Sequence, residues 1–273
     1  MWNLIKMDFY RLFTSKTMKI GVIMASLVSA GYLLISLGII ALCQFATAGD
    51  PDAAWGLSLV IPQAGWMYGI SFADIVYSGA STFSLFIGCM ISANFIGSEQ
   101  SCGYTKNFAG QLPNKGYMAI SKFVVTSLAQ FVILFIYSVV SAVFALILFS
   151  KYIDGYNVGG LFHALGLKLL LFFAINAIIV FLCTLTKSHA IAMVAGCIFG
   201  IGVTKFAYAA IDVILGTIGI NFPISRCMPD GIDSQLSVEA ASGLTVNAIV
   251  VSVVFIAAFL TANYFVQRKR DVR

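Results

Sequence analysis

The stretch that decides the fold runs from residue 119 to residue 150 and reads AISKFVVTSLAQFVILFIYSVVSAVFALILFS. It is long enough to cross a bilayer, because a helix needs about 20 mostly apolar residues to span roughly 30 Å of hydrocarbon. Five further runs qualify, at about 20–46, 70–97, 161–185, 190–213 and 244–266. None of the six shows the ten-residue alternation of a membrane β-barrel. The sequence therefore predicts six membrane-spanning helices.

Composition excludes a soluble protein. Of the 273 residues, 60% are hydrophobic and only 10% are charged, whereas soluble domains average about 45–50% apolar and about 25% charged. A soluble fold of this composition lacks the polar residues to cover its surface, but a surface that faces lipid does not need them. We therefore expect an all-α integral membrane protein, with residues 1–273 forming a single transmembrane domain.

The basic residues predict the orientation, because cytoplasmic loops are enriched in Lys and Arg. With a cytoplasmic N-terminus, twelve of the sixteen basic residues lie inside: Lys6, Arg11, Lys16, Lys19, Lys106, Lys115, Lys122, Lys187, Arg268, Lys269, Arg270 and Arg273. Six spans then leave both termini in the cytoplasm, in a multi-pass protein of the plasma membrane. The net charge of +5 is explained by this topology, and we expect no nucleic-acid partner.

Residues 1–19 predict an amphipathic helix that lies in the plane of the membrane interface. One helical stripe collects its apolar side chains: Trp2, Ile5, Phe9, Leu12 and Phe13. Lys6, Asp8 and Arg11 fall outside this stripe, where they would face headgroups or water. Two roles remain open for this elbow helix, a simple membrane anchor or a lever that responds to what docks beneath the membrane.

Residues 98–113 form a short polar insert between the second and third spans. Three apolar side chains recur there at helical spacing: Tyr104, Phe108 and Leu112. They would stack on one face of a short helix, which Pro113 ends. Such an exposed apolar row must be buried against something. Lipid, the rest of the bundle and a separate soluble partner all remain open.

Two segments, LIKMDFYRLFTSK and FIGSEQSCGYTKNFAGQLPNKGYMAISKF, resemble the permease subunit of type-2 ABC exporters. The residues that match the family's first-loop pattern in order are Glu99, Gly103, Tyr104, Thr105, Lys106, Asn107 and Lys122. The resemblance implies a coupling helix at residues 101–112, seated on a nucleotide-binding subunit. The residues expected to couple to that subunit are Glu99, Gly103, Tyr104, Lys106, Asn107, Phe108 and Leu112.

The resemblance also implies the partners. We expect two separate ABC ATPase subunits, a second permease copy, and an amphipathic peptide as the exported substrate. Residues 214–243 are expected to form a re-entrant outer helix pair that caps the exit. Exporters of hydrophobic drugs or lipids, and a non-transporting scaffold or sensor with six spans, remain as alternatives.

The chain itself carries no nucleotide-binding signature. It has no Gly-x-x-x-x-Gly-Lys-Ser/Thr motif and no Gly-Lys pair, although the backbone of that motif is what cradles nucleotide phosphates. We therefore expect a chain that is not an enzyme and has no cofactor of its own, with ATP and Mg²⁺ bound by the partner subunit.

Charged residues within the spans suggest a translocation path. A Lys at mid-membrane costs about 2.5–3.5 kcal/mol on insertion scales, so Lys205 should face protein or water, and Asp74 is its expected partner. A structural tie, a substrate contact and snorkelling to the interface remain open for this pair. The residues expected along the path are Asp74, Ser78, Ser81, Gly200 and Lys205. Gly196 and Gly200 predict close helix packing or, with Gly202, local flexing.

Overall fold

The structure is a computed structural model, which describes residues 2–47, 70–79, 82–101, 115–186, 188–217, 223–238 and 242–269. The described elements are helices, apart from two very short strands. In chain order they are α1 (Trp2–Thr14), α2 (Lys16–Thr47), β1 (Ile70–Ser71), α4 (Phe72–Gly79), α5 (Thr82–Ser101), α7 (Tyr117–Leu148), β2 (Ile153–Gly155), α8 (Val158–Thr186), α9 (His189–Ile201), α10 (Val203–Thr217), the 3₁₀ helix η2 (Ile224–Cys227), α11 (Pro229–Gln235) and α12 (Ser242–Lys269).

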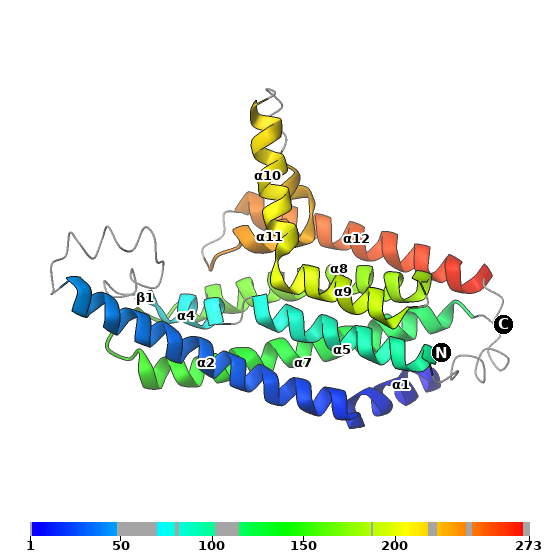
Figure 1. Ribbon diagram of the computed structural model, residues 1–273, viewed down its shortest axis with the longest axis horizontal. Coiled ribbons are helices and arrows are strands. Elements are labelled where there is room, and N and C mark those ends of the chain that lie inside the picture. The colour runs from blue at the N-terminus through cyan, green and yellow to red at the C-terminus, as the bar shows by residue number, and fades with distance from the viewer. Residues whose placement is uncertain are drawn as a thin grey trace.

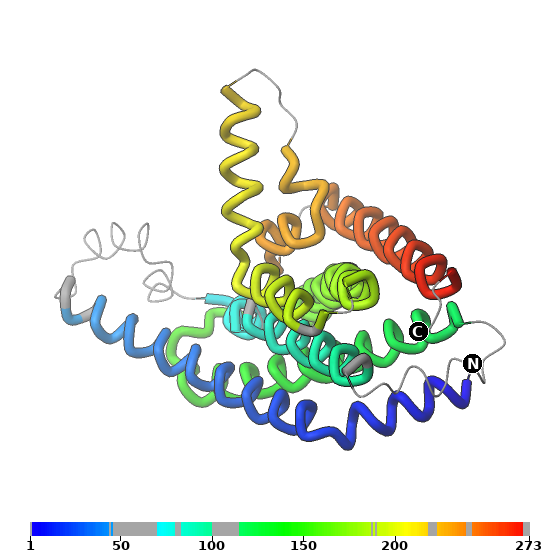
Figure 2. Tube along the Cα trace, turned by 45° about the vertical axis from the view of Figure 1, so that its right-hand side comes forward, coloured from blue at the N-terminus to red at the C-terminus, as the bar shows by residue number. Residues whose placement is uncertain are grey.

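The predicted long apolar helices are confirmed as helices that could span a membrane. Five candidate spans, Lys16–Cys43, Phe72–Glu99, Tyr117–Leu148, Val158–Thr186 and Ser242–Lys269, are long and apolar enough to cross a membrane, and α9 with α10 makes a sixth if that bent pair counts as one span. These helices run lengthwise, except α10 (Figure 1). The start of α1 and the end of α12 lie at the same end of the bundle (Figures 1 and 2). Which side of a membrane this end faces stays a prediction.

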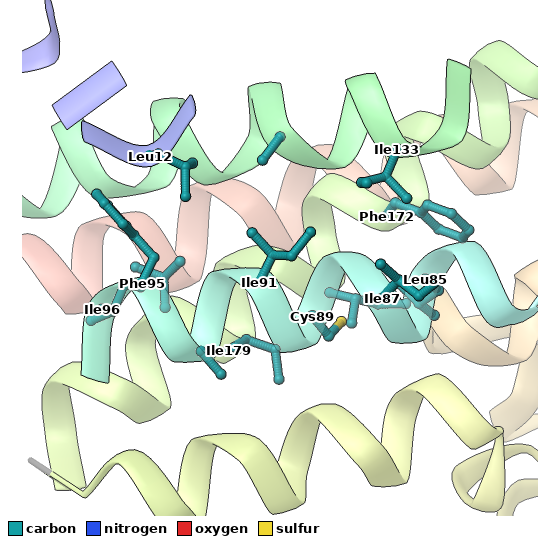
Figure 3. Close-up of a cluster of buried hydrophobic side chains, with 14 of the residues drawn as sticks. Leu12, Leu85, Ile87, Cys89, Ile91, Phe95, Ile96, Ile133, Phe172 and Ile179 are labelled. Carbon is teal, nitrogen blue, oxygen red and sulfur yellow. The ribbon is translucent and has the colours of Figure 1, made fainter. Parts of the chain in front are cut away.

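Helix α5 forms the centre of the bundle. Together with α4 it makes the candidate span with the largest buried share, since 73% of the residues in its apolar stretch are buried. Its side chains pack against α7, α8 and α9, and Figure 3 shows Ile91 and Phe95 of α5 in the same cluster as Ile133 of α7 and Phe172 of α8. Lipid is as apolar as these side chains, so close packing rather than the exclusion of water holds such helices together.

Polar side chains add bonds between the helices. The hydroxyls of Ser29 on α2 and Ser141 on α7 lie 2.8 Å apart, and the Asn176 amide on α8 donates to Thr126 on α7 over 2.9 Å. All four side chains are buried. Interhelical hydrogen bonds of this kind contribute on average about 0.6 kcal/mol each, so they fix the register of the helices more than they stabilise the bundle.

Helix α1 differs from the predicted amphipathic stripe. Trp2 and Phe9 are exposed, as side chains that face lipid would be, but the face against the bundle consists of Leu4, Asp8 and Leu12. Hydrophobicity alone predicts that Asp8 lies on the outer face of this helix. Asp8 is instead buried, because a hydroxyl on α7 satisfies its carboxylate. The position of α1 in a membrane interface stays a prediction.

The fifth predicted span is wrong as a continuous helix. The chain bends by 63° between α9 and α10, at Gly202, whose φ of 81° lies in the left-handed region. Only glycine adopts this conformation without strain. The second span also departs from expectation, because it begins with β1, which pairs in parallel with β2 through the Ile70 N–H and the Tyr152 carbonyl at 2.9 Å.

Candidate functional site

Two clusters of buried charges mark the candidate site, and the first joins α1, α5 and α7. Glu99 on α5 is almost fully buried, and its carboxylate holds two cations. Lys122 on α7 lies 2.8 Å from Glu99 Oε2, while Arg11 on α1 bonds Oε1. The Arg11 guanidinium also lies over the Phe95 ring, 4.7 Å from its centre. We call Asp8, Arg11, Glu99, Ser121 and Lys122 the α1–α5–α7 cluster.

Asp8 completes this cluster from α1. The Ser121 hydroxyl on α7 donates to Asp8 Oδ2 over 2.6 Å. Burial raises the pKa of Asp8 above its ordinary value, against the opposing hydrogen bond from Ser121 and the charges of Arg11 and Lys122. Two acids and two bases therefore neutralise one another, with Asp8, Glu99 and Lys122 buried and Arg11 partly exposed.

The cluster lies at both ends of the predicted coupling segment. Glu99 precedes the end of α5 by less than one turn, and Lys122 follows the start of α7 by little more than one turn. Of the predicted coupling residues, the structure describes Glu99; the other six lie outside the described residues: Gly103, Tyr104, Lys106, Asn107, Phe108 and Leu112. The cluster thus joins α5 and α7, the helices on either side of residues 102–114, to α1.

The second cluster lies where α9 gives way to α10. Lys205 Nζ on α10 is 2.9 Å from Asp233 Oδ2 and 3.8 Å from Asp230 Oδ1, both on α11. Lys168 Nζ on α8 reaches the other oxygen of Asp233 at 3.2 Å. Thr204 donates to Asp230 Oδ2. We call Lys168, Thr204, Lys205, Asp230 and Asp233 the bend cluster.

Burial is uneven within the bend cluster. The side chain of Lys205 is 18% exposed, whereas those of Lys168 and Asp233 are 2% and 1% exposed. Lys168 is also enclosed by aromatic rings, with Nζ 4.5 Å from the centre of Tyr77 and 5.7 Å from that of Phe172. Lys168 therefore forms the sealed side of the cluster and Lys205 its open side.

The two aspartates respond differently to this environment. Burial raises the pKa of Asp230, and the Thr204 hydrogen bond and the Lys205 charge only partly offset it. Burial acts on Asp233 in the same direction, but the charges of Lys168 and Lys205 outweigh it and hold the pKa of Asp233 below its ordinary value. Asp233 is thus the firmly ionised centre of the cluster.

The predicted pairing of Lys205 with Asp74 is wrong. The carboxylates at Lys205 are those of Asp230 and Asp233, which the sequence placed in an outer loop. Asp74 lies half-buried in the first turn of α4, one turn before Tyr77. A signal for the true partners was present, since two acids three residues apart follow Pro229 and match the two lysines within the spans.

The other residues of the predicted path are spread over the bundle. The hydroxyl of Ser78 donates to the Ile75 carbonyl of its own helix over 2.9 Å, and Ser81 lies outside the described residues. Gly200 lies against α5, where a Cβ would come within 2.5 Å of the Phe86 Cα. This contact supports the packing interpretation of the glycine pair, whereas Gly202 makes the bend.

A separate apolar groove lies between α4, α7 and α8. Its volume is about 430 Å³, and its lining includes Val76, Phe135, Leu165 and Gly166. The polar side chain in this lining, Ser138, donates to a carbonyl of its own helix. The groove therefore suits an apolar guest. Among the described residues, no group of three His, Cys, Asp or Glu side chains could hold a metal ion.

Comparison with known proteins leaves the family open. No protein-family model matches this chain, and the search of curated proteins finds no match.

Proposed function

We propose that this chain is the membrane-spanning permease subunit of an ATP-driven ABC exporter. The observation that carries the proposal is the α1–α5–α7 cluster, which ties α5 and α7, the helices that flank residues 102–114, to α1. The described long helices are apolar enough to cross a membrane, and the sequence of this segment resembles the coupling loop of type-2 ABC exporters. A separate ATPase would press on this segment, and the cluster would pass the movement to three helices at once.

Amphipathic peptides are the substrate class that we propose first. ATP and Mg²⁺ would bind to two partner subunits, and two permease copies would enclose the path between them. Closure of the ATPase pair would move the coupling segments and open an exit, and hydrolysis would reset the assembly. A non-transporting scaffold with the same helices is the competing proposal.

Copurification and turnover separate these proposals. The tagged chain, later reconstituted in lipid nanodiscs, should copurify from its native host with a soluble ATPase that carries a Walker A motif. Its ATP turnover should fall sharply when Tyr104 and Phe108 are both changed to Ala. Tyr156→Ala, a change at an exposed tyrosine next to β2, is the matched control. The exporter proposal would be contradicted if no such ATPase binds, or if its ATP turnover is the same with and without the double change.

The apolar groove favours a second substrate class, hydrophobic drugs or lipids. Gly166→Leu tests it, because Gly166 lines the groove and a Cβ added there would meet no atom within 4 Å. For a hydrophobic substrate, drug-stimulated ATP turnover should fall while peptide stimulation is unchanged. Loss of peptide stimulation alone would favour the first class.

A further inference from the structure

Helix α10 points away from the bundle, and some interaction must hold it in this direction. The chain turns by 63° at Gly202, and α10 stands away from the bundle in two views (Figures 1 and 2). No residue of α10 is buried. Its main neighbours are η2, α11 and the end of α9. Apolar packing on the long helices therefore does little to hold α10 in this direction.

Polar bonds attach α10 at both of its ends. Near its start, Lys205 and Thr204 bond the two aspartates of α11. Near its far end, Asp212 accepts hydrogen bonds from the backbone N–H groups of Ile224 and Ser225 in η2, over 2.6 and 3.2 Å. These second bonds join α10 to η2, and η2 is itself bonded to the bundle helix α12, because the Asn247 side chain donates to the Arg226 carbonyl over 2.7 Å. Helix α10 thus reaches the bundle by two polar routes, one through the bend cluster at its start and one through η2.

The bend cluster links three helices in series. Each oxygen of the Asp233 carboxylate faces a different lysine, Lys168 of α8 at 3.2 Å and Lys205 of α10 at 2.9 Å. Helix α11 therefore lies between a bundle helix and α10. The link to α8 is sealed from solvent, and the link to α10 is partly open. Exposed ion pairs are weaker and more easily exchanged than buried ones, so the open link should yield first.

We propose that the bend cluster is an ionic latch that holds α10 at the Gly202 bend and releases it when Lys205 leaves Asp233. Release loosens the start of α10 at Gly202, while Lys168 keeps α11 on the bundle and the hydrogen bonds of Thr204 and Asp212 limit how far α10 moves. The latch rests on the geometry of the described residues and does not depend on the proposed transport.

Spin-label distances in nanodiscs test the latch. Nitroxide-bearing noncanonical residues replace pairs of exposed side chains, so that the native cysteines stay in place. Val213 on α10 with Val250 on α12 reports the position of α10, and Ser234 on α11 with the same Val250 reports that of α11. In the otherwise unchanged chain, both pairs should give one narrow distance distribution.

Breaking the Lys205 link and breaking the Lys168 link should have different effects on the two distances. Lys205→Met should raise the fraction of chains outside the latched α10 distance about tenfold or more and leave the α11 distance unchanged. Lys168→Met should disturb both distances together. Lys151→Met, the same change at an exposed lysine, should alter neither.

Three results would overturn the proposal. One is an α10 distance that stays as narrow in Lys205→Met as in the unchanged chain. Another is equal broadening of both pairs in Lys205→Met, which indicates general loosening. If Lys205→Met does not fold, Lys205→Gln is measured with the same labels. Its uncharged amide cannot replace an ammonium that faces two carboxylates, so a distribution as narrow as that of the unchanged chain would also refute the latch.

Discussion

Neutralising Glu99 should cost several kcal/mol of stability, because it removes the carboxylate that contacts Lys122 and leaves Asp8 as the one acid for two cations of the cluster. The Lys122 Nζ lies 2.8 Å from Glu99, and the two side chains are 4% and 3% exposed. Removing one partner of such a pair costs about 3–5 kcal/mol. Arg11 adds little to this cost, since its side chain is 32% exposed and can turn to water. At about 2–4 °C per kcal/mol for a chain of roughly this size, Glu99→Gln should lower Tm by about 6–20 °C.

A double-variant cycle in nanodiscs checks this reasoning. Glu99→Gln combined with Lys122→Met removes both charges and should recover most of the lost stability. Asp154→Asn, a comparable change at an exposed acid, should stay within about 0.5 kcal/mol of the unchanged chain. The reasoning fails if Glu99→Gln costs no more than Asp154→Asn, or if the double variant is as unstable as Glu99→Gln alone.

Three further predictions concern single residues. Asp8→Asn should stabilise the chain at neutral pH, because burial raises the pKa of Asp8 in the folded state above 3.8 and the ionised form therefore destabilises the fold. The advantage of the variant should shrink as the pH falls below the raised pKa towards 3.8. Thermal unfolding at several pH values would reveal this trend. Gly200→Ala should destabilise the chain by about 1–3 kcal/mol, because the added Cβ would collide with Phe86. The control Gly216→Ala lies on exposed α10 with open space around it and should be neutral or slightly stabilising. Equal unfolding temperatures for the two variants would contradict this prediction. Gly202→Ala should strain the bend by about 1–2 kcal/mol and shift the α10 spin-label distance, and an unchanged distance would count against Gly202 as the cause of the bend.

The long helices were predictable because length and apolar content alone decide whether a segment can cross a bilayer. Residues 119–150, for example, correspond closely to α7 (Tyr117–Leu148). The bend at Gly202 was harder to predict from the sequence, since two neighbouring glycines have different roles: Gly200 allows helix packing and Gly202 makes a left-handed turn. Only the position of neighbouring helices distinguishes these uses.

The charged clusters were only half predictable. Glu99 and Lys205 stand out as charges beside or within apolar runs. Their partners do not, because hydrophobic periodicity assigns a lone acid such as Asp8 to the polar face of its helix. Asp233 was hidden for another reason: it follows Lys168 by 65 residues in the chain, and sequence spacing carries no information on a contact of that range.

That separation has a consequence for how the protein is made. Ribosomes add about 5–20 residues per second, so Lys168 is synthesised about 3–13 seconds before its counter-ion exists. During this interval a cationic segment must wait beside the insertion machinery or in a hydrated pocket. We expect nascent chains arrested at residue 225 to remain crosslinked to the translocon through α8, and chains arrested well beyond residue 233 to be released into lipid.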